Sequence, residues 1–204
     1  MLQFLSLFAC ALLKEPSPSS TKPDNQLAPE IVATLEERTI VVEKEKRRLS
    51  LYQNQKMLVI DGNSASWGIG LGDAPEGHKQ KEGDERTPEG VYYISDHAEH
   101  SRYQGSILLH YPNSRDAQAG LEREQISKSQ YEQIILSEKN HTPPPMNTDL
   151  GGWLLIHGST KATGLPVKAG EYDWTDGCIA MNNDDLLSLR EALGNIEGKI
   201  LILP

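Results

Sequence analysis

Short apolar and alternating runs recur along the chain from residue 40 onward. Their lengths, and the turn-forming residues between them, are typical of β-strands. Between the second and third runs, Asn54-Gln55 predicts a hairpin turn, although the glycine usual in such turns is missing. The runs that we expect to form strands are 40–43, 48–53, 57–60, 66–71, 91–95, 107–110, 154–157 and 199–203.

Two segments break this pattern and predict helices. Residues 122–139 place Ile126, Ile134 and Ile135 among charged residues, and residues 184–193 follow the capping pair Asn182-Asn183. The stretch 111–152 between two strands is long, and insertions of that length usually serve as lids or binding loops. The sequence therefore predicts a mainly β domain with helices, of the α+β class, with a helical lid insertion.

The first 37 residues differ in composition from the rest. Residues 1–13 are almost wholly apolar, and a stretch rich in Pro and Ser follows. We interpret residues 1–15 as a signal-like or lipoprotein-like leader with Cys10 as a candidate lipidation site, 16–37 as a linker, and 38–204 as the folded domain. No Lys or Arg precedes Lys14, so either the true start lies upstream or the segment is a poor signal. A frayed apolar tail is the alternative to a leader. The leader predicts export to the periplasm or cell envelope, with possible membrane anchoring through Cys10.

Composition narrows the function classes. The chain has 204 residues and a net charge of −9, which argues against nucleic acid as a partner because such partners usually meet a basic face. Its two cysteines are Cys10 and Cys178. A structural zinc site usually recruits several Cys or His at short spacing, so we predict neither a metal nor an organic cofactor.

Cys178 and His157 are the strongest candidates for chemistry. Cys178 lies between Gly177 and an apolar tripeptide, and His157 ends the apolar run 154–156. A thiol is a weak nucleophile until a base takes its proton, and imidazole is suited to that role near neutral pH. Taken alone, each residue is more often a core residue than a catalytic one. The two residues are 21 positions apart, too far for one helix face, so only the fold can bring them together.

Four motifs occur in an order seen in one family. They are 83–92 (GDERTPEGVY), 111–113 (YPN), 156–158 (IHG) and 175–179 (TDGCI). From about residue 38 to 204 the chain resembles the YkuD-type L,D-transpeptidases, bacterial cell-wall enzymes with a catalytic cysteine. The resemblance implies a β-sandwich-like catalytic domain with the cysteine at the mouth of a cleft. It also implies attack on the peptide bond that follows the third residue, a diamino acid, of a peptidoglycan stem peptide. The acyl group is then transferred to the amine of another stem.

The resemblance also implies residue roles. Cys178 matches the nucleophile and His157 the base. Gly158 stands where a backbone carbonyl orients the imidazole ring, and backbone N–H groups at Gly177 and Cys178 stand where the family stabilises the oxyanion. Asp176 is a candidate substrate-binding residue, with a turn residue as the alternative.

Two further side chains are candidates for substrate binding. Arg86 could pair with a substrate carboxylate, with an internal ion pair as the alternative. Trp174, like Trp153, could wall the cleft, with core packing as the alternative. Among the other histidines only His110, directly before the YPN motif at 111–113, is worth testing.

The chain departs from the common family pattern beside the nucleophile. Asp176 replaces a His, and Ala180 replaces an Arg. This variant resembles a YafK-like branch, in which hydrolytic release of wall-linked lipoprotein is a recognised alternative. We therefore expect a transpeptidase first. The alternatives are an L,D-amidase or carboxypeptidase that hydrolyses stem peptides or releases wall-linked lipoprotein, and a non-catalytic wall-binding homologue.

Overall fold

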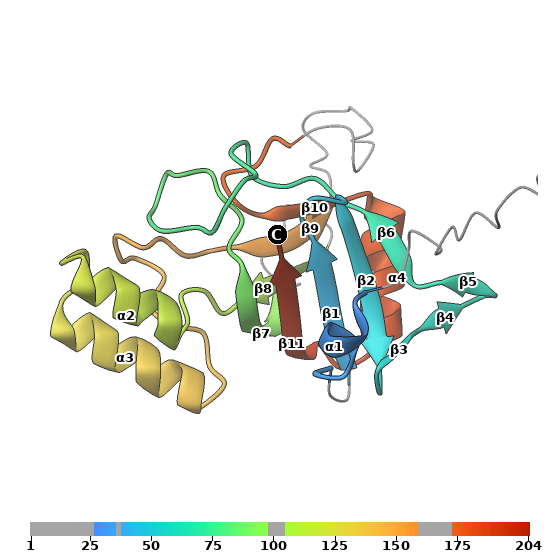
Figure 1. Ribbon diagram of the computed structural model, residues 1–204, viewed down its shortest axis with the longest axis horizontal. Helices are drawn as coiled ribbons and strands as arrows, with labels where there is room; N and C mark the ends of the chain where they lie inside the picture. Colours follow the sequence, from blue (N-terminus) through green and yellow to red (C-terminus); the bar gives the residue numbers. More distant parts are fainter. Residues whose placement is uncertain (1–26, 36–37, 98–104, 159–172) are drawn as a thin grey trace, which may run out of the picture.

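The computed structural model describes residues 27–35, 38–97, 105–158 and 173–204. Within these residues one mixed sheet of nine strands curls around an apolar core (Figure 1). A separate two-stranded hairpin projects from it, formed by β4 (Val59–Ile60) and β5 (Asn63–Ser64). The strands of the main sheet are β1 (Arg38–Glu43), β2 (Arg48–Gln53), β3 (Lys56–Met57), β6 (Ser66–Gly68), β7 (Gly90–His97), β8 (Ser106–Leu109), β9 (Leu155–Gly158), β10 (Ile179–Met181) and β11 (Glu197–Leu203).

The sheet follows the order β10-β9-β8-β7-β11-β1-β2-β3, and β6 also pairs with β2. The pairs β9–β10 and β1–β11 are parallel, and the other pairs are antiparallel. Just after β6, Gly70 exchanges two backbone hydrogen bonds with Ala180 of β10, both with N···O distances of 2.9 Å. This bridge joins the two ends of the curled sheet, so the strand that follows Cys178 is paired on both sides.

The concave side of the sheet encloses the main core. Helix α4 (Asn183–Leu193) packs against this core through Leu186, Leu189 and Leu193, which are all buried. A period of three and four residues on one helix face explains this packing, and the helix predicted over 184–193 is confirmed. The prediction of a mainly β, α+β domain is confirmed, and its sandwich-like core is formed by one curled sheet.

A second, smaller cluster covers the opposite face of β1 and β2. Helix α1 (Pro29–Val32) and its flanking residues Leu27 and Leu35 pack there against Val41 and Tyr52. Residues 27–35 fall inside the predicted linker, 16–37, but their apolar side chains pack on the sheet. The packed unit therefore begins before residue 38. The predicted leader, 1–15, lies outside the described residues, and among those described no helix is both long and apolar enough to cross a membrane.

The insertion between β8 and β9 carries two helices, α2 (Ser114–Glu122) and α3 (Lys128–Lys139), which lie side by side at one end of the sheet (Figure 1). Each begins with a capping box, at Asn113 and at Ser127. The helix predicted over 122–139 is wrong in its start, because Glu124 has a positive φ of 58° and Ser127 caps a new helix. The helices share a small core of their own, made of Ala117, Ile126, Ile134 and Leu150.

Several local predictions are refined by the backbone. The hairpin turn at Asn54-Gln55 is confirmed, and both residues adopt the positive φ that this turn type requires, 50° and 66°. The predicted strand 57–60 is split at Leu58, whose N–H bonds to Leu51 O at 2.8 Å. The predicted strand 66–71 ends its regular pairing at Gly68 and continues as the bridge that closes the sheet.

Candidate active site

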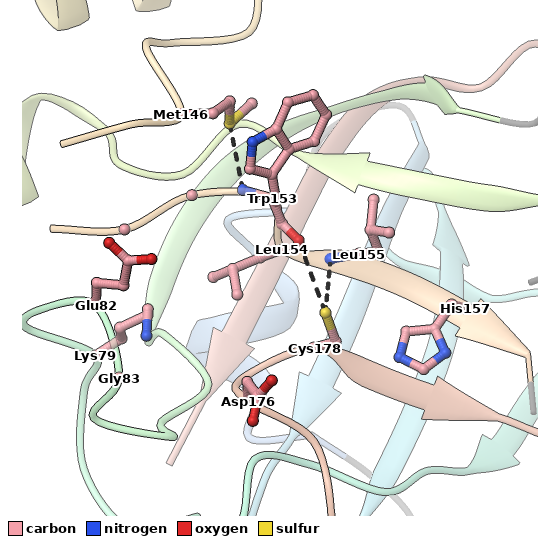
Figure 2. Close-up of a pocket in the computed structure, with 12 residues that line it drawn as sticks. Lys79, Glu82, Gly83, Met146, Trp153, Leu154, Leu155, His157, Asp176 and Cys178 are labelled. Atoms are coloured by element: carbon pink, nitrogen blue, oxygen red, sulfur yellow. Dashed lines mark hydrogen bonds between the residues drawn. The ribbon is translucent and has the colours of Figure 1, made fainter. Parts of the chain in front are cut away.

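The thiol and the imidazole come from neighbouring strands. His157 belongs to β9, and Cys178 is the residue directly before β10. These strands are parallel, with His157 opposite Ala180. Since every second residue of a strand faces the same side, Cys178, two positions before Ala180, is expected on the face that carries His157. Both side chains line one cavity (Figure 2).

A tight turn fixes the backbone around Cys178. The Thr175 hydroxyl donates a hydrogen bond to Cys178 O at 2.7 Å and accepts one from the Gly177 N–H at 3.2 Å. Gly177 has a φ of 122°, and a Cβ there would lie 2.6 Å from Arg86 O. Only glycine fits this position, because the turn packs directly against another stretch of backbone.

The start of this turn is tied to the sheet by an ion pair. Arg47 Nη2 lies 2.6 Å from Asp173 Oδ2, and Arg47 Nε lies 3.0 Å from both carboxylate oxygens. Asp173 Oδ1 also accepts a hydrogen bond from the Leu71 N–H at 3.0 Å. The segment that leads to the thiol is therefore anchored at both ends, at Asp173 and at the bridge to β10.

The thiol is largely enclosed. The Leu155 N–H donates to Cys178 Sγ at 3.4 Å, and Sγ lies 3.8 Å from Trp153 O. Burial raises the pKa of the Cys178 thiol and the Asp176 carboxylate raises it further, while the Leu155 N–H and the Lys79 ammonium act in the opposite direction. The net result is a thiol that stays protonated in the resting protein at neutral pH.

The imidazole is oriented by backbone and by an aromatic edge. His157 Nδ1 lies 2.8 Å from Gly158 O, and a carbonyl oxygen only accepts, so Nδ1 carries the proton. Burial lowers the pKa of His157, and the hydrogen bond to Gly158 opposes this shift. The ring also meets Trp174 edge-on, with the centroids 5.8 Å apart. The resting pair is therefore a neutral imidazole beside a neutral thiol.

The cavity has a volume of about 580 Å³ and both apolar and charged walls. Trp153 is 58% exposed at its rim and holds an unusual positive φ of 54°, with its N–H 3.4 Å from Met146 Sδ. Residues 146–153 come from the end of the insertion, whereas α2 and α3 supply no lining residue. The lining residues are Lys79, Glu82, Gly83, Met146, Gly151, Gly152, Trp153, Leu154, Leu155, His157, Asp176 and Cys178. Whether the insertion acts as a lid stays a prediction.

The remaining candidates from the sequence are distributed unevenly. Asp176 lines the cavity. Trp174 is not one of the lining residues, but it contacts the ring of His157, which is. Arg86 is not a lining residue, and its backbone supports Gly177 from behind. The Gly177 N–H, a predicted oxyanion donor, is engaged with the Thr175 hydroxyl in this structure.

His110 lies outside the cavity. Its Nε2 is 2.9 Å from Ser95 Oγ, and its buried Nδ1 has no hydrogen-bond partner within the described residues. Burial, assisted by the nearby His141, lowers the pKa of His110 to about 4. We therefore assign His110 to the packing between the sheet and the insertion.

Sequence reasoning missed two charged residues of the cavity, Lys79 and Glu82. Both lie in the loop before β7, where no periodic pattern marks a position as inward-facing. The signal that could have found them is their place next to the quoted 83–92 motif. No cluster of three or more His, Cys, Asp or Glu suited to a metal ion occurs within the described ranges.

Comparison with known proteins agrees with this fold. The family model of the L,D-transpeptidase catalytic domain matches residues 37–195. The chain therefore belongs to the L,D-transpeptidase catalytic domain family, also called the YkuD family. A comparison with curated proteins finds no match.

Several solved structures are similar to this chain, and the first of those below supports the same fold by its TM-score of 0.54. The helical cell shape determining protein Pgp2 from Campylobacter jejuni is 20% identical with a TM-score of 0.54, over 81% of this chain and 47% of that chain. Bd1075 from Bdellovibrio bacteriovorus is 20% identical with a TM-score of 0.47, over 84% of this chain and 49% of that chain. An L,D-transpeptidase from Mycobacterium tuberculosis H37Rv is 9% identical with a TM-score of 0.42, over 82% of this chain and 57% of that chain. The chain thus spans about half the length of the first two.

Proposed function

We propose that this protein is a cysteine-dependent L,D-transpeptidase that acts on peptidoglycan stem peptides. The observation that carries the proposal is that Cys178 and His157 line one cavity, His157 from β9 and Cys178 from the position directly before the neighbouring parallel strand β10. Membership of the L,D-transpeptidase family supplies the reaction class. The cavity, at about 580 Å³, is in the usual size range for small-ligand sites.

The proposed first half-reaction forms a thioester. Cys178 Sγ attacks the carbonyl carbon of the diamino acid, the third residue of the donor stem, while His157 Nε2 takes the thiol proton. The carbon–nitrogen bond to the following residue then breaks, and the imidazolium returns the proton to the leaving amine. In the second half-reaction an acceptor amine attacks the thioester, its proton passes through His157, and the thiol is released.

The directions of the two pKa shifts define when the proton moves. Burial raises the pKa of Cys178 and lowers that of His157, so a stable thiolate–imidazolium pair is disfavoured at rest. Proton transfer should therefore accompany attack on the substrate. The Gly158 carbonyl supports this role, because it keeps the proton on Nδ1 and leaves Nε2 as the basic nitrogen.

The position of Asp176 is compatible with two acyl acceptors, the amine of another stem and water. Its carboxylate lines the cavity and acts on the thiol pKa, so it lies where it could attract the cationic amine of an acceptor stem or orient a water molecule. We place amine transfer first. Hydrolysis, including release of a wall-linked lipoprotein, is the alternative that the resemblance to the YafK-like branch favours.

The test is incubation of the full chain with stem tetrapeptides, followed by mass analysis of the protein and products. We expect a covalent acyl adduct on Cys178 and crosslinked dimers. Cys178→Ala should form neither, and His157→Ala should form the adduct at least a hundredfold more slowly, because base assistance of this kind contributes typically 10²–10⁴-fold. His110→Gln changes a buried histidine outside the cavity and is the matched control.

The outcomes separate the alternatives. Tripeptides without dimers would replace the transpeptidase by a hydrolase. Absence of any adduct with tetrapeptide or with a carbapenem, an inhibitor class that acylates this family's cysteine, would favour a non-catalytic wall-binding protein. Export to the periplasm or cell envelope follows from the same proposal, since the stem peptides lie there. Lipidation of Cys10, outside the described residues, stays a prediction.

A further inference from the structure

Two lysines of this chain are buried to the same degree but use their hydrogen-bond donors differently. The side chains of Lys44 and Lys79 are each 3% exposed. Lys44 Nζ donates to Gly77 O at 2.6 Å, Thr87 O at 3.0 Å and Glu89 Oε1 at 2.8 Å. An ammonium carries three N–H donors, so the donors of Lys44 are all used.

Lys79 is not satisfied in this way. Within the described part of the chain its Nζ makes one hydrogen bond, to Asp84 Oδ1 at 2.8 Å. An ammonium with donors left over is costly to bury, because each donor has given up its hydrogen bond to water. Lys79 lines the cavity that contains Cys178, and Figure 2 draws it on the loop that borders this cavity.

Asp84 has several hydrogen-bond donors besides Lys79. Its carboxylate also accepts backbone N–H groups from Gln80 at 2.7 Å, Lys81 at 3.1 Å and Arg86 at 3.2 Å. Burial alone would raise the pKa of Asp84, but these donors together with Lys79 hold it below its usual value. Asp84 thus has a full set of donors, whereas Lys79 has one acceptor, so the pair fixes the ammonium and leaves part of its capacity for a ligand.

We propose that Lys79 is a specificity-determining residue whose ammonium binds a carboxylate of the donor stem peptide inside the cavity. This inference rests on the proposed function for the identity of the ligand. An anionic oxygen of the ligand supplies a second charge-assisted acceptor, in addition to Asp84, for the remaining N–H groups of the buried ammonium. Asp84, held by three backbone donors, positions the ammonium without competing for its remaining N–H groups.

The other charges of the cavity are compatible with such a ligand. Glu82 and Asp176 also line it, so the lining presents two carboxylates and one ammonium beside the thiol. A stem peptide carries both signs, since its diamino acid has a free amine and its backbone ends in a carboxylate. Opposite charges on the ligand can therefore meet opposite charges on the wall, and Lys79 is the cationic partner among the described lining residues.

Three sources could supply the carboxylate, namely the glutamate of the stem, the side-chain carboxylate of a diaminopimelate, and the terminal alanine. The experiment measures binding, by calorimetry, of a diaminopimelate tetrapeptide to the full chain carrying Cys178→Ala, which prevents turnover. Each carboxylate is then converted to its amide in turn, and a tetrapeptide with lysine as the diamino acid is added. We expect one amidation to weaken binding by about 10- to 100-fold, the range of a hydrogen bond to a charged group, and the other two to change it little.

The second arm introduces Lys79→Met and Lys79→Arg into the same background. With Lys79→Met the sensitive amidation should change the Kd by less than threefold, whereas Lys79→Arg should keep part of the discrimination because its charge remains. A purely structural role for Lys79 would weaken all peptides equally and leave their ratios unchanged. Asp84→Asn keeps the ammonium, and should therefore preserve the sign of the discrimination.

Several results would overturn the proposal. These are amidations that all change the Kd by less than threefold, no binding of any tetrapeptide, or discrimination that survives Lys79→Met. If Lys79→Met does not fold, the amidation series on the Cys178→Ala chain and the Lys79→Arg variant decide alone. Failure of the proposed function is seen separately, as absence of an acyl adduct in the chain with Cys178 intact while carboxylate discrimination persists.

Discussion

Three glycine substitutions should separate the two reasons why Gly177 is required before Cys178. Gly177→Ala combines a positive φ of 122° with a Cβ 2.6 Å from Arg86 O. Gly62→Ala has a positive φ of 81° but no atom within 4 Å of its Cβ. Gly72→Ala has no positive φ, yet its Cβ would lie 2.0 Å from Glu85 O. The three variants thus isolate strain, overlap, and both together.

The magnitudes follow from these geometries. Left-handed backbone costs an alanine about 1–2 kcal/mol, which sets the expected loss of unfolding free energy for Gly62→Ala. Forcing extra atoms into packed structure costs typically 1–3 kcal/mol, which is the minimum for Gly72→Ala because backbone cannot rotate away. Gly177→Ala should therefore lose about 2–5 kcal/mol. Relief of its overlap also displaces Cys178, and a shift of about 1 Å can reduce a rate by about 10²-fold.

The assay pairs urea unfolding with acylation of Cys178 by a stem tetrapeptide. Gly62→Ala should reduce stability while the acylation rate stays within twofold of wild type. Gly72→Ala and Gly177→Ala should reduce both the stability and the acylation rate, because a Cβ added at Gly72 would lie 3.1 Å from Gly177 Cα. The reasoning fails if Gly177→Ala is as stable as Gly62→Ala and acylates at the wild-type rate.

Two further predictions concern pH. Because the pKa of His110 is lowered from 6.5 to about 4 in the folded protein, the unfolded chain binds the extra proton between these values, so stability is present above about pH 6.5 and lost as pH falls toward 4. His110 should contribute about 3 kcal/mol to this loss in urea unfolding, and His110→Gln should remove that contribution while the one from His157, whose pKa is also lowered, remains. An unchanged pH slope in His110→Gln would contradict the assignment. Alkylation of Cys178 by iodoacetamide should shift to lower pH in Asp176→Asn and to higher pH in Lys79→Met, since the first group raises and the second lowers the thiol pKa. Shifts in the same direction would be incompatible with this account.

The strands and the two principal site residues were accessible from sequence because each rests on a local signal. Alternation and turn residues marked the strands, and the short TDGCI and IHG motifs marked Cys178 and His157. The break between α2 and α3 was missed because Ile126 and Ile134 suggested one continuous apolar face, while the stop depends on backbone geometry at Glu124 and a cap at Ser127.

Other features depend on contacts between distant segments and leave a weaker mark. Leu27, Ile31 and Leu35 recur every four residues within a stretch interpreted as linker, and this spacing was the available signal for α1 packing on the sheet. Lys79 gave none of this kind, because a loop residue becomes part of a cavity only through the fold around it.

The bridge between Gly70 and Ala180 also has a consequence for the order of folding. It joins segments that are distant along the chain, and closing a long loop costs entropy before the contact can return any stability. The turn that carries the thiol needs Arg47, Leu71 and Arg86 from the first half of the chain for its anchoring and support. A newly synthesised chain therefore cannot complete the turn that carries Cys178 until both halves have met, so the reactivity that we propose for this thiol is acquired only with the completed fold.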